Sequence, residues 1–310
     1  MTTTPAPSAL ARLADLGARL GRAPDLDTLV TVTLDGLADL FGYGHSLLLL
    51  LDEAGTRLFT LGSHGYDAEG VGSEVRTGEG IIGMCAARAT PMRVGNLRQM
   101  LRYAARVRQE HEESGEAAPG CEVPLPGLAR PGSQLAAPAM VLGQLVGVLA
   151  VESPEPIAFD EDDEALLCVV AGLVASAIEI DAEQERAAEA QPVDSGDGGR
   201  QATRRTRVRF FPVDGSTFLD DDYLIKGVAG RLLWSLLQHH QRDGRTAFTN
   251  REMRLDPTLE LPELRDNFES RLVLLKRRLD EREAPVRITK TGRGAFRLDV
   301  ETSLVLESAS

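Results

Sequence analysis

Cysteine is scarce in this sequence of 310 residues, which holds only three. Three cysteines exclude a scaffold stapled by several disulfides, and they are too few for a zinc site with four cysteine ligands. Positive charge is also in deficit, because 34 Lys and Arg stand against 47 Asp and Glu, a formal net charge of −13. The chain is therefore not a uniformly basic nucleic-acid-binding protein, although one region of it can still be basic.

Long uninterrupted hydrophobic runs are also lacking. The two most apolar stretches cover residues 133–151 and 165–180. Proline and glycine interrupt the first, and the second is shorter than the roughly 20 residues that a membrane-spanning helix needs. The chain does not open with a basic and apolar signal sequence. We therefore expect a soluble, cytoplasmic protein without a membrane partner.

Motifs of common catalytic machineries are missing as well. The sequence contains no H-E-x-x-H zinc motif, no phosphate-binding loop of the form G-x-x-x-x-G-K-[ST], and no order of Ser, His and Asp that predicts a catalytic triad. We therefore expect that the protein is not an enzyme.

Charge is distributed unevenly along the chain. Residues 1–200 hold 14 basic and 30 acidic side chains, a net charge of −16, whereas residues 201–310 hold 20 and 17, a net charge of +3. This asymmetry indicates that the second part meets an anion and the first does not. A polar, glycine-rich stretch between them predicts a flexible linker. The expected division is a sensor domain at 1–187, a linker at 188–204, a second domain at 205–302 and a C-terminal tail at 303–310.

The first 187 residues predict an α+β fold. Apolar residues at helical spacing predict helices over 8–20, over 164–185 and over a segment that ends at Phe41, for which Asp27 is the expected N-cap. Short apolar runs predict strands over 45–51, 57–62, 92–94, 133–138 and 140–151. Helices at both ends with an antiparallel sheet between them indicate α+β and not a doubly wound fold.

Four stretches in this part resemble a GAF domain, over about residues 8–187. They are T-G-E-G-I-I-G at 77–83, T-P-M-R-V at 90–94, V-L-G-Q-L-V-G-V-L-A-V at 141–151 and F-D-E-D-D at 159–163. The resemblance implies a sensor domain with a small effector. It leaves the ligand and any cofactor open, because GAF domains bind cyclic nucleotides, tetrapyrroles, haem, small acids or nothing.

Cysteine and histidine offer one route to a cofactor. By analogy with the family, Cys85, His111 and Cys121 fall in or near the pocket, where three such ligands can hold zinc or an iron–sulfur cluster. The alternative is that Cys85 is a small buried apolar residue and Cys121 an exposed thiol. Free methionine sulfoxide reductases are also GAF proteins, but their cysteine between the glycines of this motif is absent between Gly80 and Gly83. The sequence does not identify which metal such a site would hold.

Residues 207–300 predict a second small domain. The expected elements are two strands around an Asp214-Gly215 turn, helices over 228–240 and 265–283, and a hairpin over 286–298. In the longer helix, Phe268, Leu272 and Leu279 fall on one buried face. Basic residues of that helix lie largely off this face.

This order of elements resembles the OmpR-type winged-helix DNA-binding domain, over about residues 207–300. The most specific stretches are 265–279, similar to the recognition helix of that family, and 288–298, similar to its wing. The resemblance implies a helix in the major groove and a wing on the neighbouring backbone or minor groove. The residues that it assigns to DNA are Arg265, Asn267, Ser270, Arg271, Lys276, Arg277, Arg278, Lys290 and Arg293.

These resemblances predict a one-component transcriptional regulator, in which the sensor domain controls a homodimer on DNA. The expected seam of the dimer is formed by Leu166, Val170, Leu173, Val174 and Ile178, and the alternative is that these residues pack on their own sheet. Two other functions stay open. One is a regulator that acts through protein–protein contacts, with RNA polymerase as a partner. The other is a redox or metal sensor that uses Cys85, His111 and Cys121.

Overall fold

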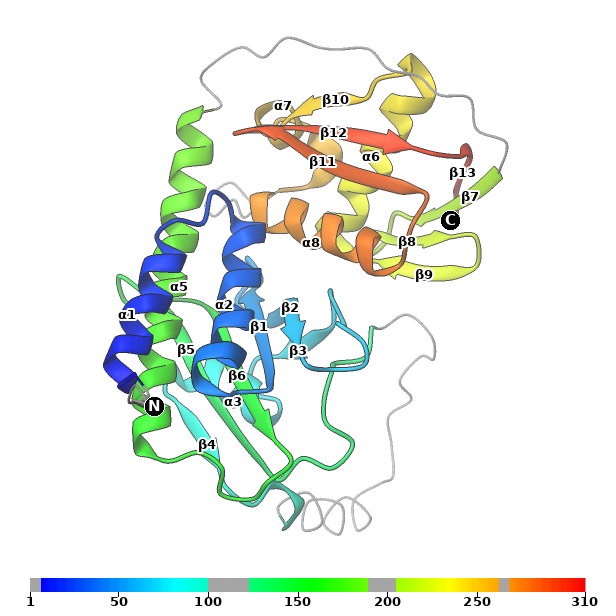
Figure 1. The fold of residues 1–310 in the computed structure, drawn as a ribbon. Coiled ribbons are helices and arrows are strands. Elements are labelled where there is room, and N and C mark those ends of the chain that lie inside the picture. Colours follow the sequence, from blue (N-terminus) through cyan, green and yellow to red (C-terminus); the bar gives the residue numbers. More distant parts are fainter. Residues whose placement is uncertain (1–6, 100–122, 189–204, 262–267, 310) are drawn as a thin grey trace, which may run out of the picture. The chain divides into compact units, whose positions relative to one another are not determined.

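The computed structural model describes residues 7–99, 123–188, 205–261 and 268–309 (Figure 1). The described residues fall into two compact units, which meet along the sequence between Glu179 and Ile180. Each unit has its own sheet structure and its own buried apolar residues. The chain is an α+β protein, which confirms this part of the predicted fold class. The winged-helix fold expected for the second unit stays a prediction.

The first unit is built on one six-stranded sheet with the strand order β3-β2-β1-β6-β5-β4, in which all neighbouring strands are antiparallel. The strands are β1 (His45–Leu51), β2 (Arg57–His64), β3 (Glu74–Arg76), β4 (Met92–Val94), β5 (Ser133–Val141) and β6 (Gln144–Ser153). The helices that begin in this unit are α1 (Ala9–Leu20), α2 (Leu26–Phe41), α3 (Gly80–Arg88) and α5 (Glu161–Ala188).

Capping residues set the ends of α2. The Asp25 carboxylate accepts a hydrogen bond from the backbone N–H of Thr28 at 2.8 Å, so Asp25 is the N-cap, and the expected cap Asp27 lies in the first turn. Gly42 ends the helix at φ +76°, a left-handed conformation that suits glycine. The difference of two residues from the expected start arises because Asp25 and Asp27 are both good caps, and sequence alone does not choose between them.

Both faces of this sheet are covered. Leu47, Leu48 and Leu49 of β1 are all 0% exposed, although successive side chains on a strand point to opposite faces. Leu47 and Leu49 belong to an apolar cluster with Ile82 and Cys85 of α3, so α3 covers that face. Helix α2 also contacts β1, and we assign it to the opposite face. Each leucine buried in this way stabilises the fold by about 1.5–3 kcal/mol.

Helix α5 has one buried and one exposed apolar stripe. Val170, Val174 and Ile178 are 0%, 0% and 7% exposed, whereas Val169 and Leu173 are 48% and 40% exposed. Val170, Val174 and Ile178 are therefore buried within their own chain. This agrees with the alternative to the expected dimer seam, in which these residues pack inside one copy. Of the other two members of that seam, Leu173 is exposed and Leu166 is half-buried.

By length and composition alone, α5 also qualifies as a membrane-crossing helix, over Glu161–Ala187, among the residues described. The core helix of a soluble protein passes the same test, and a buried apolar stripe beside an exposed face is typical of such a helix. The expected lack of a membrane partner therefore stays a prediction.

The second unit contains two small sheets, with the strand orders β13-β7-β8-β9 and β10-β12-β11. Its strands are β7 (Arg205–Phe211), β8 (Ser216–Leu219), β9 (Asp222–Ile225), β10 (Ala247–Thr249), β11 (Val286–Gly292), β12 (Ala295–Val300) and β13 (Ser303–Ser308). Its helices are α6 (Gly227–Asp243), α7 (Asn250–Arg254), the 3-10 turn η1 (Pro257–Leu259) and α8 (Phe268–Glu281).

Two hairpins of the second unit turn at glycines. Gly215 has φ +73° between β7 and β8, and Gly294 has φ +65° between β11 and β12. Phe248 of β10 stacks on Phe296 of β12, with ring centroids 5.9 Å apart, and both rings are almost fully buried. The segment assigned to a C-terminal tail differs from that expectation, because β13 pairs in parallel with β7.

Candidate functional site

The sheet face that α3 covers ends in a group of polar side chains. Ala150 of β6 belongs to the apolar cluster on this face, and Glu152, two residues further along the strand, shares its face. Glu152 is 8% exposed, and its Oε1 accepts a hydrogen bond from Gln134 Nε2 at 3.0 Å. Its Oε2 accepts from the backbone N–H of Leu128 at 3.1 Å and from the Tyr66 hydroxyl at 3.3 Å. Three donors therefore converge on one buried carboxylate.

Burial controls the protonation of this polar group. It raises the pKa of Glu152, while the hydrogen bonds from Leu128 and Tyr66 oppose the rise. Burial also raises the pKa of Tyr66, and the neighbouring Glu152 adds to that rise. The ring of His45 lies edge-on to Tyr66, at 5.4 Å between centroids. Apolar surface with a few converging polar groups is the usual make-up of a small-molecule site.

Of the three predicted cofactor ligands, the structure describes Cys85. This side chain is 0% exposed within α3, and burial raises the pKa of its thiol to about 12, with a smaller contribution from Cys168. Metals and electrophiles react with the thiolate, so a buried and protonated thiol suits neither. His111 and Cys121 lie outside the described residues, so the grouping of the three stays a prediction.

The residues predicted to contact DNA on α8 have different surroundings. Arg265 and Asn267 lie outside the described residues, and Ser270 is 6% exposed. Arg271 and Arg277 are half-buried, and each has an interaction partner.

Two further residues on α8 form ion pairs within the helix. Lys276 lies 3.6 Å from Asp280. Arg278 is 6% exposed; its Nε donates to the backbone oxygen of Leu224 at 2.8 Å, and its Nη1 donates to Glu281 at 2.7 Å. Because both bonds hold the guanidinium inside the second unit, Arg278 joins α8 to β9 and does not stand at the surface.

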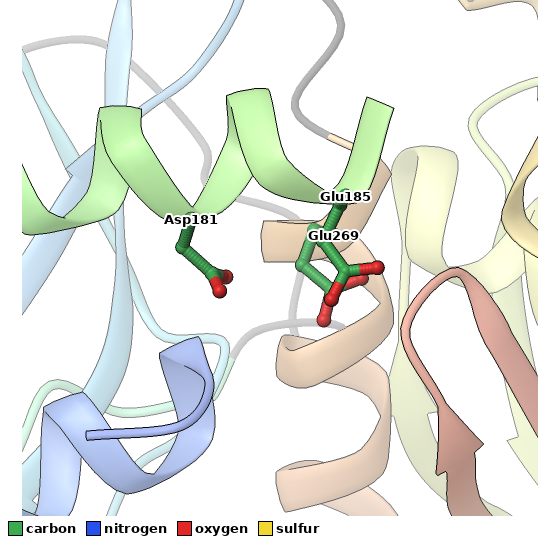
Figure 2. Close-up of side chains that lie close together, drawn as sticks. All are labelled: Asp181, Glu185 and Glu269. Atoms are coloured by element: carbon green, nitrogen blue, oxygen red, sulfur yellow. The ribbon is translucent and has the colours of Figure 1, made fainter. Parts of the chain in front are cut away.

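Lys290 and Arg293 of the β11–β12 hairpin meet a group of carboxylates. Lys290 Nζ lies 2.8 Å from Glu185 Oε1 and 2.7 Å from Glu269 Oε1. Glu185 Oε2 accepts a hydrogen bond from the backbone N–H of Gly294 at 2.5 Å, and Arg293 lies 4.0 Å from Asp181. Figure 2 shows Asp181 and Glu185 on α5 and Glu269 on α8. All of these residues belong to the second unit.

Burial and charge act against each other in this acidic group. Burial raises the pKa of Asp181 to about 6, Lys290 opposes the rise, and Glu269 and Glu185 add to it. Burial lowers the pKa of Lys290, but the attraction of Glu269 and the hydrogen bonds to both glutamates outweigh burial, so the net change is a rise.

The same three carboxylates are close enough to be considered as a metal site. Their oxygens lie within 4.8 Å of one another. Lys290 Nζ, however, already contacts Glu185 and Glu269 and supplies the positive charge that a metal ion would bring. The donor set is therefore neutralised from within the chain, and we do not assign a metal to it.

This acidic group was not predicted from the sequence, although α5 contains a signal for it. Asp181 and Glu185 follow Val174 and Ile178 at helical spacing, so they continue the buried stripe of the helix. A carboxylate on a buried stripe requires a cation or hydrogen-bond donors from elsewhere in the fold. The helical spacing of these carboxylates therefore predicts that a cation or donor lies next to them, but it does not identify that residue.

Comparison with known families assigns the first unit. Residues 25–178 match the model of the GAF domain family. No curated protein matches the chain. Similar solved structures include the GAF domain of an Acinetobacter phosphoenolpyruvate-protein phosphotransferase, with 22% identity, a TM-score of 0.45, and coverage of 60% of this chain and 97% of that one.

Two other solved structures are similar over the same part. Free methionine-R-sulfoxide reductase from Neisseria meningitidis, in complex with its substrate, has 18% identity and a TM-score of 0.44, with 59% of this chain and 98% of that chain covered. A putative GAF sensor protein from Burkholderia vietnamiensis has 16% identity and a TM-score of 0.44, with 59% and 99% covered. At these scores the similarities carry no functional argument. Residues 25–178 of this chain therefore form a GAF domain, followed by a C-terminal mixed α/β region without a family assignment.

Proposed function

We propose that this chain is a one-component transcriptional regulator, in which the GAF domain responds to a small effector and the C-terminal region binds duplex DNA as a winged helix. The observation that carries the proposal is the succession of α7, α8 and the β11–β12 hairpin, in which α8 contacts both α7 and β11. An α-helix fits the major groove, and a β-ribbon beside it reaches the neighbouring backbone. We also propose that the protein is cytoplasmic and that it is not an enzyme.

Basic side chains that are half-buried or exposed on these elements support the proposal. Arg271 and Arg277 of α8 are half-buried, and Arg287 and Arg293 of the hairpin are exposed. Contacts between such side chains and phosphates supply most of the non-specific affinity for DNA and make it depend on salt. Asp280 reduces the local positive field, so we expect weak binding by one copy and stronger binding by a dimer.

A homodimer fits the exposed apolar residues of the first unit. Leu10 of α1 is 75% exposed, and Val169 and Leu173 of α5 are 48% and 40% exposed. A Cβ atom at Gly17 of α1 would lie 3.9 Å from Leu173, so the two helices run close together at this point. Pairing of two copies along α1 and α5 would bury these side chains.

The polar group around Glu152 is the proposed polar end of the effector site. A buried carboxylate suits an effector that donates hydrogen bonds or carries a positive charge. Cys85 is fully buried, so we do not propose that this thiol senses the effector.

Salt-dependent binding to a random-sequence duplex tests the proposed DNA-binding function. The full chain is compared with a triple variant, Arg271→Ala, Lys276→Ala and Arg293→Ala, by fluorescence anisotropy between about 50 and 200 mM salt. If each residue contacts one phosphate, the slope of log affinity against log salt falls by about 3 in the variant.

The matched control removes three exposed arginines from the first unit, Arg22→Ala, Arg76→Ala and Arg88→Ala, with the same change in net charge. Equal binding by both triple variants would contradict the assignment of this surface. The absence of duplex binding at low salt would favour the other function, in which the C-terminal region binds a protein such as RNA polymerase.

A further inference from the structure

The turn of the β11–β12 hairpin contacts the Glu185 carboxylate in the way in which a protein contacts a bound anion. Lys290 Nζ contacts Glu185 Oε1 at 2.8 Å, and the backbone N–H of Gly294 contacts Glu185 Oε2 at 2.5 Å. Each oxygen of the carboxylate thus has its own donor, one of them charged. Glu185 itself is 0% exposed. A lysine ammonium combined with a backbone N–H at a glycine turn is a combination that also binds phosphate oxygens.

Neighbouring groups hold both donors in place independently of Glu185. The backbone oxygen of Gly294 accepts a hydrogen bond from the backbone N–H of Asn250 at 2.9 Å, which fixes the turn. Lys290 is also held by Glu269 at 2.7 Å, and Glu269 in turn accepts from Asn250 Nδ2 at 2.9 Å. The two donors therefore stay aimed at the same point when the Glu185 side chain is removed, so the anion site is preorganised.

The balance of positive and negative side chains around this turn indicates that Glu185 is the residue that excludes other anions. Lys290 and Arg293 bring two positive charges, and Asp181, Glu185 and Glu269 bring three carboxyl groups. Removing the charge of Glu185 leaves two carboxyl groups against two cations. An incoming phosphate then meets two free donor positions without a net excess of carboxylates.

We propose that Lys290 Nζ and the Gly294 N–H form a binding site for a phosphodiester of the DNA backbone, and that Glu185 occupies this site as an internal competitor. The inference rests on the proposed DNA-binding function and describes how Glu185 would regulate that binding. Glu185 belongs to α5, a helix whose residues up to Glu179 are part of the first unit. A change in the first unit that displaces the last turns of α5 would free the site for DNA.

The Gly294 amide gives a direct test that needs no DNA. Arg293–Gly294 is the only Arg–Gly step in the sequence, so labelling of arginine with carbonyl ¹³C and glycine with ¹⁵N isolates one NMR signal of the full chain. In Glu185→Ala, we expect an upfield shift of the Gly294 proton and its return downfield on titration with inorganic phosphate. In the unsubstituted chain, phosphate leaves the signal in place. An unchanged signal in Glu185→Ala at all phosphate concentrations would overturn the proposal.

Duplex binding distinguishes a backbone phosphodiester from free phosphate. We expect Glu185→Ala to bind a random-sequence duplex about tenfold more tightly than the unsubstituted chain, within the usual range of coupling between two sites. The salt slope should rise by about 1, for one added phosphate contact. Adding Lys290→Ala to Glu185→Ala should abolish both gains. The matched control is Glu183→Ala, an exposed carboxylate on the same helix, which should change neither quantity.

The outcomes separate this inference from the function on which it rests. If the unsubstituted chain binds duplex DNA and Glu185→Ala binds no more tightly, the competitor role of Glu185 is refuted and the DNA-binding function stands. If no variant binds duplex DNA at low salt, the DNA-binding function is refuted. A phosphate response at Gly294 without any duplex binding would contradict the phosphodiester as ligand and identify a site for a free phosphate.

Discussion

We expect Asp181 to make the stability of the second unit depend on pH. Burial raises its pKa from 3.8 to about 6 in the folded chain, so folding favours the protonated carboxyl group. The stability that protonation supplies is present below the unfolded pKa of 3.8 and is lost as the pH rises through about 6. A difference of about 2 pKa units corresponds to about 3 kcal/mol of unfolding free energy.

The substitution Asp181→Asn removes this titration and keeps the shape of the side chain. We expect the unfolding free energy of the variant, relative to the unsubstituted chain, to increase by about 3 kcal/mol between about pH 4 and pH 8. Trp234, the only tryptophan of the chain, lies in the second unit and stacks on Phe210 at 4.9 Å between centroids. Urea unfolding followed by its fluorescence therefore reports on this unit.

A matched control for this experiment is Glu183→Gln, an exposed residue two positions further along the same helix. Its stability relative to the unsubstituted chain should not change across the same pH range. An advantage of Asp181→Asn that is also independent of pH would contradict the raised pKa of Asp181, because the carboxyl group would then titrate alike in the folded and unfolded chains.

Three other substitutions or reactions test separate parts of the structure. Arg278→Ala leaves the largely buried Glu281 carboxylate without its ion-pair partner and the Leu224 carbonyl without its donor, and we expect it to lower the unfolding free energy by about 3–5 kcal/mol in the same fluorescence assay; a loss below about 1 kcal/mol would contradict its structural role. Cys85 should resist alkylation at about pH 8 in the folded chain and react after unfolding, as followed by mass spectrometry, because its thiol is buried and has a pKa of about 12; rapid labelling of folded protein would show that the site is open. Tyr66→Phe removes one hydrogen bond to Glu152 and should cost about 1 kcal/mol of GAF-domain stability in a thermal melt followed by far-ultraviolet circular dichroism, and an unchanged melt would show that this bond contributes nothing.

Local patterns were sufficient to predict many elements of the fold. The continuous run of five leucines in β1 indicated a strand buried on both faces, and Leu48 and Leu49 are fully buried. The Asp214-Gly215 turn was visible because glycine adopts the positive φ that this hairpin needs. Helix ends were less accurate, since α6 runs over Gly227–Asp243 where 228–240 was expected.

Features that depend on distant parts of the chain were not predictable in this way. The pairing of β13 with β7 joins residues about one hundred positions apart. The short alternation of apolar residues in β13 does not indicate with which strand it pairs. The contact between Lys290 and Glu185 spans 105 positions. The resemblance to a winged helix placed Lys290 on a DNA-facing wing, but only the tertiary structure shows the carboxylates that surround it.

The proposed sequence-specific duplex binding by the C-terminal region can be measured by selection from a random duplex pool with the full chain. We expect recovery of paired half-sites about one helical turn apart, or a multiple of that distance, as for a dimer. This recovery should be lost in the Arg271, Lys276 and Arg293 triple variant and kept in the Arg22, Arg76 and Arg88 triple variant. No enrichment of any sequence at low salt would contradict the account.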